Sequence, residues 1–179
     1  GLRFTDAHAP ASVCVPTRYG LLTGRYPFRS DRSERVESRI EPGRMTLASL
    51  LAGQGYTTAC LGKWHQGFDG GKVRQDYELP LEGGPVDRGF DFFFGMPASL
   101  DIPPYYWIEN DRCLAAPTET IEDNFSEGWT RIQGAFWRAG NIAPRFRHVD
   151  VLPQLRRRAV DYLKEHQKKS PGKPLFLYL

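Results

Sequence analysis

Cys14 lies in a setting that could support chemistry. It stands two residues before Pro16 and four before Arg18, at the expected start of a helix. Helix N-termini present free amide groups that favour negative charge, and Arg18 would lie one turn further along the same helical face. Such an electropositive position favours a reactive thiolate or a bound oxyanion. The alternative is a small buried cysteine at a helix start, with Arg18 on the surface.

A second group of candidate residues follows an expected strand. The segment 55–65 runs into Gly62, and Lys63 and His65 then alternate, so that both can face the same side. Ligands of open α/β sheets gather beyond the carboxyl ends of the strands. A cation and a titratable imidazole at that place suit an anionic substrate and proton transfer. On its own, the Lys-x-His spacing is equally that of an ordinary polar loop.

The first half of the chain should supply two helices that position these residues. We expect one helix within residues 11–25, ending at Gly24, a residue suited to a left-handed cap. A second, short helix should begin after Thr46 as its N-cap and end at Gly53. Its predicted apolar face consists of Leu47, Leu50 and Leu51.

The remaining elements complete an α/β pattern. Residues 56–61 are a strand candidate, and residues 66–150, rich in glycine, proline and aromatic residues, should be mostly loops with short strands. Asp150 is expected to cap a long helix with Pro153 in its first turn, and 175–179 should be a buried strand. The predicted apolar face of that helix consists of Leu152, Leu155, Ala159 and Leu163. Helices that alternate with strands predict an α/β architecture with a largely parallel sheet.

Composition and charge exclude several classes of protein. The 179 residues suffice for one domain with a hydrophobic core, and no apolar run reaches the ~20 residues of a membrane-spanning helix. The net charge of +3, from 24 basic and 21 acidic residues, is too balanced to indicate nucleic-acid binding. The three cysteines have neither zinc-site nor disulfide-framework spacing, although one pair could still form a bridge: Cys14, Cys60 and Cys113.

Together, the two candidate segments resemble the motifs of the sulfatase family. The first motif, C-x-P-[S/T]-R-x-x-x-L-T-G, is met by residues 14–24, and the second, G-Y-x-T-x-x-x-G-K-x-H, by residues 55–65. The stretch 89–101 is also similar to arylsulfatase-type members. The resemblance covers nearly the whole chain and is weakest between 110 and 147. It implies a partial alkaline-phosphatase-like sulfatase domain, in which helices flank a mixed, mostly parallel sheet.

The resemblance implies a modified nucleophile. In this family the cysteine of the first motif is oxidised after synthesis to Cα-formylglycine. The residues that match Pro16 and Arg18 help to mark it for a formylglycine-generating enzyme or an anaerobic maturase. Cys14 would thus become an aldehyde whose hydrate carries two hydroxyls. One would attack the sulfur of a sulfate ester, and the other, once deprotonated, would release inorganic sulfate, whereas a serine would remain trapped as its sulfate ester.

The resemblance also implies roles for neighbouring residues. Arg18 would hold the diol, Lys63 would bridge the diol and a sulfate oxygen, and His65 would take the proton of the second hydroxyl. Ser99 would bind near the sulfate, unless it is only a turn hydroxyl, and Asp101 would buttress that loop. A divalent cation, usually calcium, would polarise the sulfate oxygens, with the modified cysteine as one of its ligands.

Several family features have no counterpart in the sequence. Residues 1–13 hold only Asp6 instead of an aspartate pair, and the downstream metal ligands and leaving-group histidine are also absent. We therefore expect residues 1–179 to be an incomplete N-terminal catalytic domain, without the first strand and the C-terminal part, and inactive alone. The parent would be a sulfuric ester hydrolase of an aryl sulfate or a sulfated carbohydrate. The family suggests a periplasmic, secreted or lysosomal protein.

Two other functions stay open at this point. The same superfamily contains phosphonate monoester and phosphodiester hydrolases that use the same modified cysteine. A non-catalytic sulfatase-like domain could instead bind sulfated glycans with Cys14 left unconverted. The mass of the peptide that contains Cys14 separates this binding domain from an enzyme.

The other histidines and the aromatic residues have weaker assignments. His8 is expected to be structural, whereas His148 and His166 should lie on the surface. Asn124-Phe125-Ser126 matches a glycosylation sequon. The aromatic segment 100–107 either frames a substrate entrance or belongs to the core.

Overall fold

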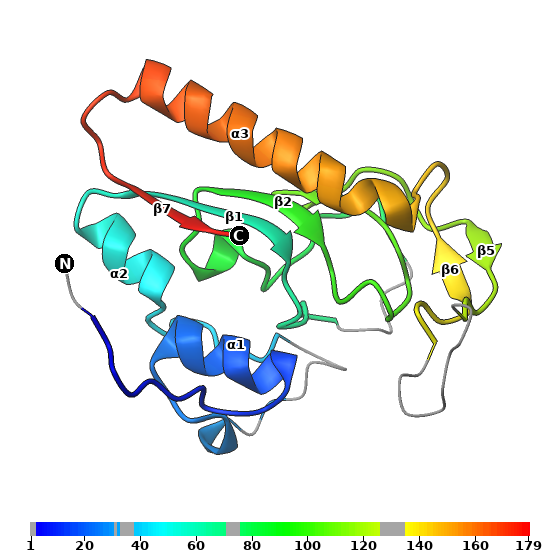
Figure 1. Ribbon diagram of the computed structural model, residues 1–179, viewed down its shortest axis with the longest axis horizontal. Coiled ribbons are helices and arrows are strands. Elements are labelled where there is room, and N and C mark those ends of the chain that lie inside the picture. The colour runs from blue at the N-terminus through cyan, green and yellow to red at the C-terminus, as the bar shows by residue number, and fades with distance from the viewer. Residues whose placement is uncertain (1–2, 31, 33–37, 71–75, 126–134) are drawn as a thin grey trace.

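A five-stranded sheet forms the centre of the protein. The computed structural model describes residues 3–30, 32, 38–70, 76–125 and 135–179. The sheet has the strand order β4-β3-β2-β1-β7. Figure 1 shows β7, β1 and β2 of this order side by side. Its strands are β1 (Thr57–Lys63), β2 (Phe92–Met96), β3 (Ile108–Glu109), β4 (Arg112–Cys113) and β7 (Leu175–Tyr178). β1 pairs in parallel with β2 and β7, whereas β3 and β4 add antiparallel strands beyond β2.

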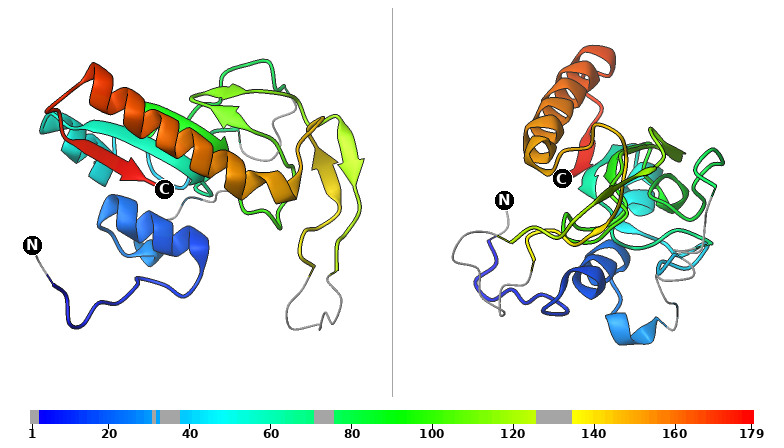
Figure 2. Two further views of the ribbon diagram at one scale, coloured as in Figure 1. Left: turned by 45° about the horizontal axis from the view of Figure 1, so that its top comes forward. Right: turned by 90° about the vertical axis from the view of Figure 1, so that its right-hand side faces the viewer.

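Helices cover both faces of this sheet. α1 (Cys14–Thr23) and α2 (Leu47–Gly53) lie on one face, and α3 (Val151–Lys169) lies on the other, as Figure 1 and Figure 2 show. In the described part of the chain, three short 3-10 helices lie in the connections: η1 (Pro27–Arg29), η3 (Val86–Arg88) and η4 (His148–Asp150). The predicted α/β class, with a mixed sheet between helices, is confirmed.

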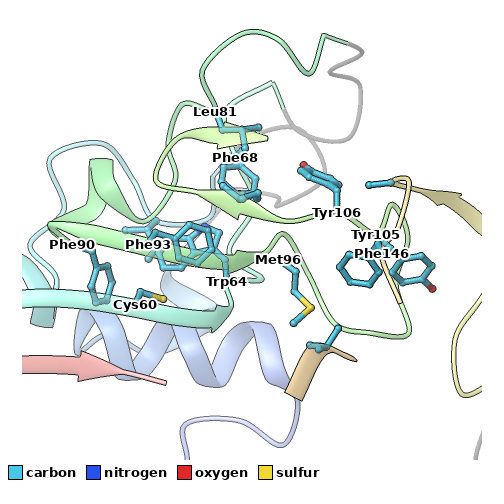
Figure 3. Close-up of a cluster of buried hydrophobic side chains, with 14 of the residues drawn as sticks. Cys60, Trp64, Phe68, Leu81, Phe90, Phe93, Met96, Tyr105, Tyr106 and Phe146 are labelled. Atoms are coloured by element: carbon cyan, nitrogen blue, oxygen red, sulfur yellow. The ribbon is translucent and has the colours of Figure 1, made fainter. Parts of the chain in front are cut away.

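The side chains of β1 alternate between the two helical layers. Ala59 and Leu61 pack with Ala159 of α3. Cys60 belongs to a larger cluster on the opposite side, which includes Tyr19 of α1 and is shown in part in Figure 3. Because both faces of β1 are covered, the strand is a continuous buried run and lacks polar alternation.

The carboxyl end of β1 approaches β2 very closely. Gly62 and Gly95 are partners in the parallel register, and Gly62 has a φ of +117°. A side-chain carbon on Gly95 would collide with the carbonyl oxygen of Gly62. Glycine is therefore required at this crossing. The close pairing lets β1 continue to Lys63, two residues beyond the predicted end at Leu61.

The two predicted N-terminal helices are present, and their caps are confirmed. Gly24 has a φ of 65° and donates its N–H to the carbonyl oxygen of Gly20 at 2.9 Å. Thr46 and Ser49 form a reciprocal capping box at the start of α2, with N···O distances of 3.0 and 2.8 Å. These caps hold α1 and α2 at defined positions beneath the sheet.

The predicted apolar face of α2 is wrong. Ala48 is the fully buried residue of this helix, whereas Leu50 is 45% exposed and Leu47 and Leu51 are half-buried. α2 packs against α1 and β1. A small side chain at that contact lets the helix lie close to its neighbours, which a row of leucines would prevent.

The start of α3 also differs from the prediction. Asp150 ends the 3-10 turn η4, and its side chain makes no capping hydrogen bond. Its carboxylate instead lies 3.6 Å from the guanidinium of Arg147. Pro153 is in the first turn of α3, as predicted. The long helix α3 thus continues directly from the preceding 3-10 turn, and the Asp150 side chain does not cap its N-terminus.

The face of α3 that packs on the sheet is shifted from the predicted one. Leu152 and Leu163, both predicted to face the core, are 77% and 44% exposed. The contacting residues follow spacings of four, four and three: Val151, Leu155, Ala159 and Tyr162. Only Leu155 and Ala159 of the predicted face are confirmed.

β7 was predicted as a buried strand, and this is only partly correct. All four of its residues are half-buried, and Leu179 is 72% exposed. Within the described residues β7 pairs with β1 alone and lies at the edge of the sheet. Its position still brings the Tyr178 ring next to α1.

Within residues 66–150, the described parts 66–70, 76–125 and 135–150 are mostly loops with short strands, as predicted. A small antiparallel sheet, β5 (Glu119–Ile121) and β6 (Gly140–Ile142), lies beyond the start of α3 (Figure 2). Asp101 buttresses this region, since its carboxylate lies 3.4 Å from the guanidinium of Arg138. This contact ties the loop after β2 to the segment that leads into β6.

An aromatic cluster joins this small sheet to the main body. The His148 ring centroid lies 4.3 Å from that of Trp137 and 4.5 Å from that of Tyr105. His148 is 9% exposed, so its predicted surface position is wrong, and burial lowers the pKa of its imidazole. Tyr105 and Tyr106 are also buried. This part of the segment 100–107 belongs to the core.

The remaining assignments concern residues on the surface. His8 is exposed and pairs with the equally exposed Asp6 at 2.6 Å in the loop before α1. His166 is partly exposed and bonds a backbone carbonyl after α3. Asn124 forms an isolated bridge with Trp137, whereas Ser126 of the sequon lies outside the described residues. Within the described ranges, no helix combines the length and apolar character needed to cross a lipid bilayer.

Candidate active site

The carboxyl ends of β1 and β2 bring two predicted sulfate-binding residues together. Lys63 is the last residue of β1, and Ser99 lies three residues beyond the end of β2. The Lys63 ammonium donates a hydrogen bond to the Ser99 hydroxyl at 3.2 Å. An ammonium and a hydroxyl at this distance can both contact one tetrahedral oxyanion. Because of this contact, the Ser99 hydroxyl does more than stabilise a local turn.

Arg18 links three elements at this place. It comes from α1, and its Nη1 donates to the carbonyl oxygen of Lys63 at 2.8 Å and to the hydroxyl of Tyr178 at 3.0 Å. The guanidinium also lies 5.6 Å from the centre of the Tyr178 ring. These contacts fix the position of a second positive charge next to the end of β1. Anionic ligands are therefore favoured at this corner of the sheet.

His65 lies next to Lys63, but not in the predicted extended alternation. β1 ends at Lys63, and His65 has a left-handed φ of 57°. Such a conformation costs about 1–3 kcal/mol for a residue other than glycine and persists only where the surroundings impose it. Here the His65 N–H donates to the carbonyl oxygen of Pro97 at 2.9 Å, while the buried Trp64 anchors the preceding position. The strain is concentrated at a residue predicted to transfer a proton.

Cys14 is the accessible cysteine of this region. It is the exposed first residue of α1, and the N-cap Val13 provides no side-chain hydrogen bond to the helix amides. Pro16 lies in the same first turn, where the absent N–H of a proline costs nothing. The N-terminal amides of α1 thus remain directed towards an anion at the Cys14 position.

The other two cysteines differ from Cys14 in access. Cys60 is fully buried in β1, and burial raises the pKa of its thiol to about 12, although the Arg18 charge acts in the opposite direction. Cys113 is half-buried, and burial raises its thiol pKa as well. All three cysteines are free, so no pair forms the bridge that the sequence left open. Only Cys14 offers an exposed thiol for modification.

Two residues outside the two motifs also belong to this site. Tyr178 lies in an apolar strand, yet its hydroxyl contacts Arg18. Gln66 is fully buried and donates to the carbonyl oxygens of Val15 and His65. In the sequence, the only indication that Gln66 belongs to the site is its position next to His65, directly after the second motif.

The described residues do not form a cation site by themselves. No group of three or more histidine, cysteine, aspartate or glutamate side chains is close enough to hold a metal in the described ranges. The charged side chains placed at the end of β1 are those of Arg18 and Lys63, which attract anions. The predicted calcium and the ligand role of Cys14 stay predictions, and the roles proposed below do not depend on a metal.

Comparison with known proteins identifies the family of the chain. A family model described as Sulfatase matches residues 1–179. The chain belongs to the sulfatase family. An N-acetylgalactosamine-6-O-sulfatase of Bacteroides thetaiotaomicron is 28% identical over 210 residues, which span 100% of this chain and 40% of that protein. Arylsulfatase G of Canis lupus familiaris is 40% identical over 191 residues, which span 100% of this chain and 33% of that protein.

Solved sulfatase structures share the fold. One structure, from work on the metabolism of multiple glycosaminoglycans by Bacteroides thetaiotaomicron, superposes with a TM-score of 0.74 at 25% sequence identity. The match covers 99% of this chain and 42% of that one. The predicted alkaline-phosphatase-like sulfatase fold is confirmed. This sulfatase chain spans about a third to two fifths of the length of the relatives named here, between 33% and 40%.

Proposed function

We propose that this sulfatase hydrolyses sulfate esters, with Cys14 converted to Cα-formylglycine as its nucleophile. The observation that carries the proposal is the placement of Arg18, Lys63 and Ser99 at one end of β1. Two cations and a hydroxyl there suit a tetrahedral sulfate group. Cys14 is exposed at the N-terminus of the helix that supplies Arg18, so modification would occur beside this anion site.

Residues of this chain would then each take a separate role in binding or hydrolysis. The hydrated aldehyde at Cys14, once formed, supplies one hydroxyl for attack on sulfur and a second for release of the sulfate. Lys63 and Ser99 would hold the sulfate oxygens, and the Lys63 ammonium would offset the negative charge that grows as the S–O bond breaks. His65 would accept a proton. Arg18 would orient the diol while its contact to the Lys63 carbonyl fixes the strand end.

The substrate class and partners follow from the same proposal. We infer an aryl sulfate or a sulfated carbohydrate as substrate, and a relative named N-acetylgalactosamine-6-O-sulfatase favours the carbohydrate. Conversion of Cys14 requires a formylglycine-generating enzyme or an anaerobic maturase. A periplasmic, secreted or lysosomal location and an incomplete N-terminal catalytic domain over residues 1–179 are parts of this proposal.

The mass of the Cys14 peptide tests the proposal. The full-length parent is expressed with a formylglycine-generating enzyme, and conversion lowers the peptide mass by roughly 18 Da through loss of H₂S and gain of O. The converted protein should release sulfate from an aryl sulfate, and the Cys14→Ala variant should not. An unconverted thiol in such a host would instead favour a glycan-binding domain. Faster cleavage of an aryl phosphate diester than of the sulfate would favour a phosphodiesterase.

A further inference from the structure

Gln66 makes two side-chain hydrogen bonds that join the two motif segments. Its side-chain NH₂ donates to the carbonyl oxygen of Val15 at 2.9 Å and to that of His65 at 2.9 Å. Both partners are acceptors, so the orientation of the amide is determined by chemistry. Val15 is the residue after Cys14 in the first turn of α1. One amide group therefore ties the turn of the nucleophile to the residue proposed to accept its proton.

The main chain of Gln66 is also held in place. Its carbonyl oxygen accepts a hydrogen bond from the N–H of Arg39 at 2.7 Å. The residue is fully buried, between Trp64 and Phe68 along the chain, which are core residues as well. The side chain is thus anchored from behind and has little freedom to release its two acceptors. A contact this rigid can fix the distance between the first turn of α1 and the loop after β1.

The other end of the Gln66 amide has no partner. Its Oε1 is buried and accepts no hydrogen bond within the described residues. A buried carbonyl oxygen without a donor opposes folding. An apolar side chain of the same shape would fill the space without this cost, so the amide does not serve packing alone. What the amide adds is the double contact to the carbonyls of Val15 and His65.

We propose that Gln66 is a positioning residue that sets the separation and orientation of Cys14 and His65. The inference rests on the proposed function, because it assigns a nucleophile to the first position and a proton acceptor to the second. Without the amide, the first turn of α1 and the loop after β1 keep their folds and the Arg18–Lys63 contact, but lose the hydrogen bond that joins them directly. Small displacements of reacting groups lower rates strongly even where binding is unchanged.

The first test is the Gln66→Met variant of the full-length parent. Methionine is unbranched and of similar length, but has no amide to donate. With rates divided by the measured formylglycine content, kcat on an aryl sulfate should fall about 10- to 100-fold, and KM should stay within about threefold. Gln54→Met is the matched control, because Gln54 is exposed at the end of α2. A kcat within twofold of the wild type would overturn the inference.

The Gln66→Glu variant supplies a readout that a packing role would not move. At neutral pH a carboxylate would face two carbonyl oxygens and could donate to neither. Burial without a cation raises the pKa of such a carboxyl, and its protonated form has one O–H donor. The activity of Gln66→Glu relative to wild type should therefore rise as the pH falls. The same fractional loss at every pH would contradict a role for the donated hydrogen bond.

These experiments separate this inference from the proposed function. An active, converted wild type with an unaffected Gln66→Met variant overturns the role of Gln66 alone. If the wild type is not converted, hydrogen exchange of the peptides 13–19 and 63–67 decides: about tenfold faster exchange in Gln66→Met supports the tether, and unchanged exchange overturns it. If Gln66→Met does not fold, the inference is tested with Gln66→Glu at low pH, where the protonated carboxyl restores one donor.

Discussion

Two histidine neighbourhoods in this protein show how similar residue types reach opposite roles. His65 lies beside Lys63 and Ser99 at the end of β1, in a strained backbone conformation. His148 is enclosed by aromatic rings, and its pKa is lowered by burial. The first region places donors and charges where an anion can bind. The second encloses its histidine among core rings, and within the described residues the buried Nε2 of His148 has no hydrogen-bond partner. Access and neighbouring charge, not residue type, distinguish a site from a packing cluster.

The largest expected effect separates the two histidines directly. His65→Asn removes the imidazole, while asparagine tolerates the left-handed backbone at this position. In the full-length enzyme kcat should fall about 100- to 10,000-fold, as for loss of a general base. His148→Phe, which suits the aromatic cluster, should keep kcat within about threefold. Steady-state kinetics per mole of formylglycine measures both, and a stronger loss in His148→Phe would reverse the comparison.

The next effect concerns the charge beside His65. Lys63→Met keeps the side-chain length but removes the ammonium next to the Ser99 hydroxyl. We expect kcat/KM on an aryl sulfate to fall about 100- to 1,000-fold, because one stabilising contact to developing negative charge is lost. Lys164→Met, on the exposed side of α3, is the control and should be neutral. Equal effects of the two variants would show that the lysine acts through overall charge.

A smaller effect is expected from the support of Arg18. Tyr178→Phe keeps the ring beneath the guanidinium and removes only the hydroxyl that accepts its hydrogen bond. Loss of one charge-assisted hydrogen bond of about 1.5 kcal/mol predicts a roughly tenfold lower kcat/KM. Tyr162→Phe on α3, whose ring stacks on Phe92, serves as the control. A neutral Tyr178→Phe would mean that the Lys63 carbonyl holds Arg18 by itself.

The smallest effect is a pH dependence of stability at His148. Burial lowers its pKa in the folded protein, so below the unfolded value of about 6.5 the unfolded chain binds the additional proton. Stability should therefore fall as the pH drops from about 7.5 to 5.5 and be fully present above the unfolded pKa. Thermal unfolding across this range should show a shallower slope for His148→Phe than for wild type. Identical slopes would place the titrating group elsewhere.

The motifs predicted much of the site because their spacing reflects local backbone demands. Gly24 is the left-handed cap, Gly62 adopts a φ of +117° that suits glycine, and the Lys63–Ser99 pair follows from two parallel strands ending at one edge. The contacts of Gln66 and Tyr178 could not be predicted, because a single sequence does not reveal that a glutamine is buried or that positions 18 and 178 meet. Tertiary packing alone creates these contacts.

The helix faces and the cap of α3 were predicted less well, for a related reason. On α3, the pairs Leu152/Val151 and Leu163/Tyr162 are adjacent apolar residues, and only the docking angle against the sheet decides which member is buried. Asp150 has the side chain of a helix cap, but the preceding 3-10 turn already occupies that position. The periodicity of a sequence therefore locates the buried face of a helix only to within one residue.

The contact between Arg18 and Tyr178 also has a consequence for the chain during its synthesis. The two residues are 160 positions apart, so a ribosome that adds about 5–20 residues per second needs about 8–30 s to make the second after the first. Throughout that interval Arg18 lacks the partner that fixes it in the folded chain, while Cys14 has already left the site of synthesis. Each newly made molecule thus passes through a period in which Arg18 lacks its contact to Tyr178, and docking of β7 ends that period.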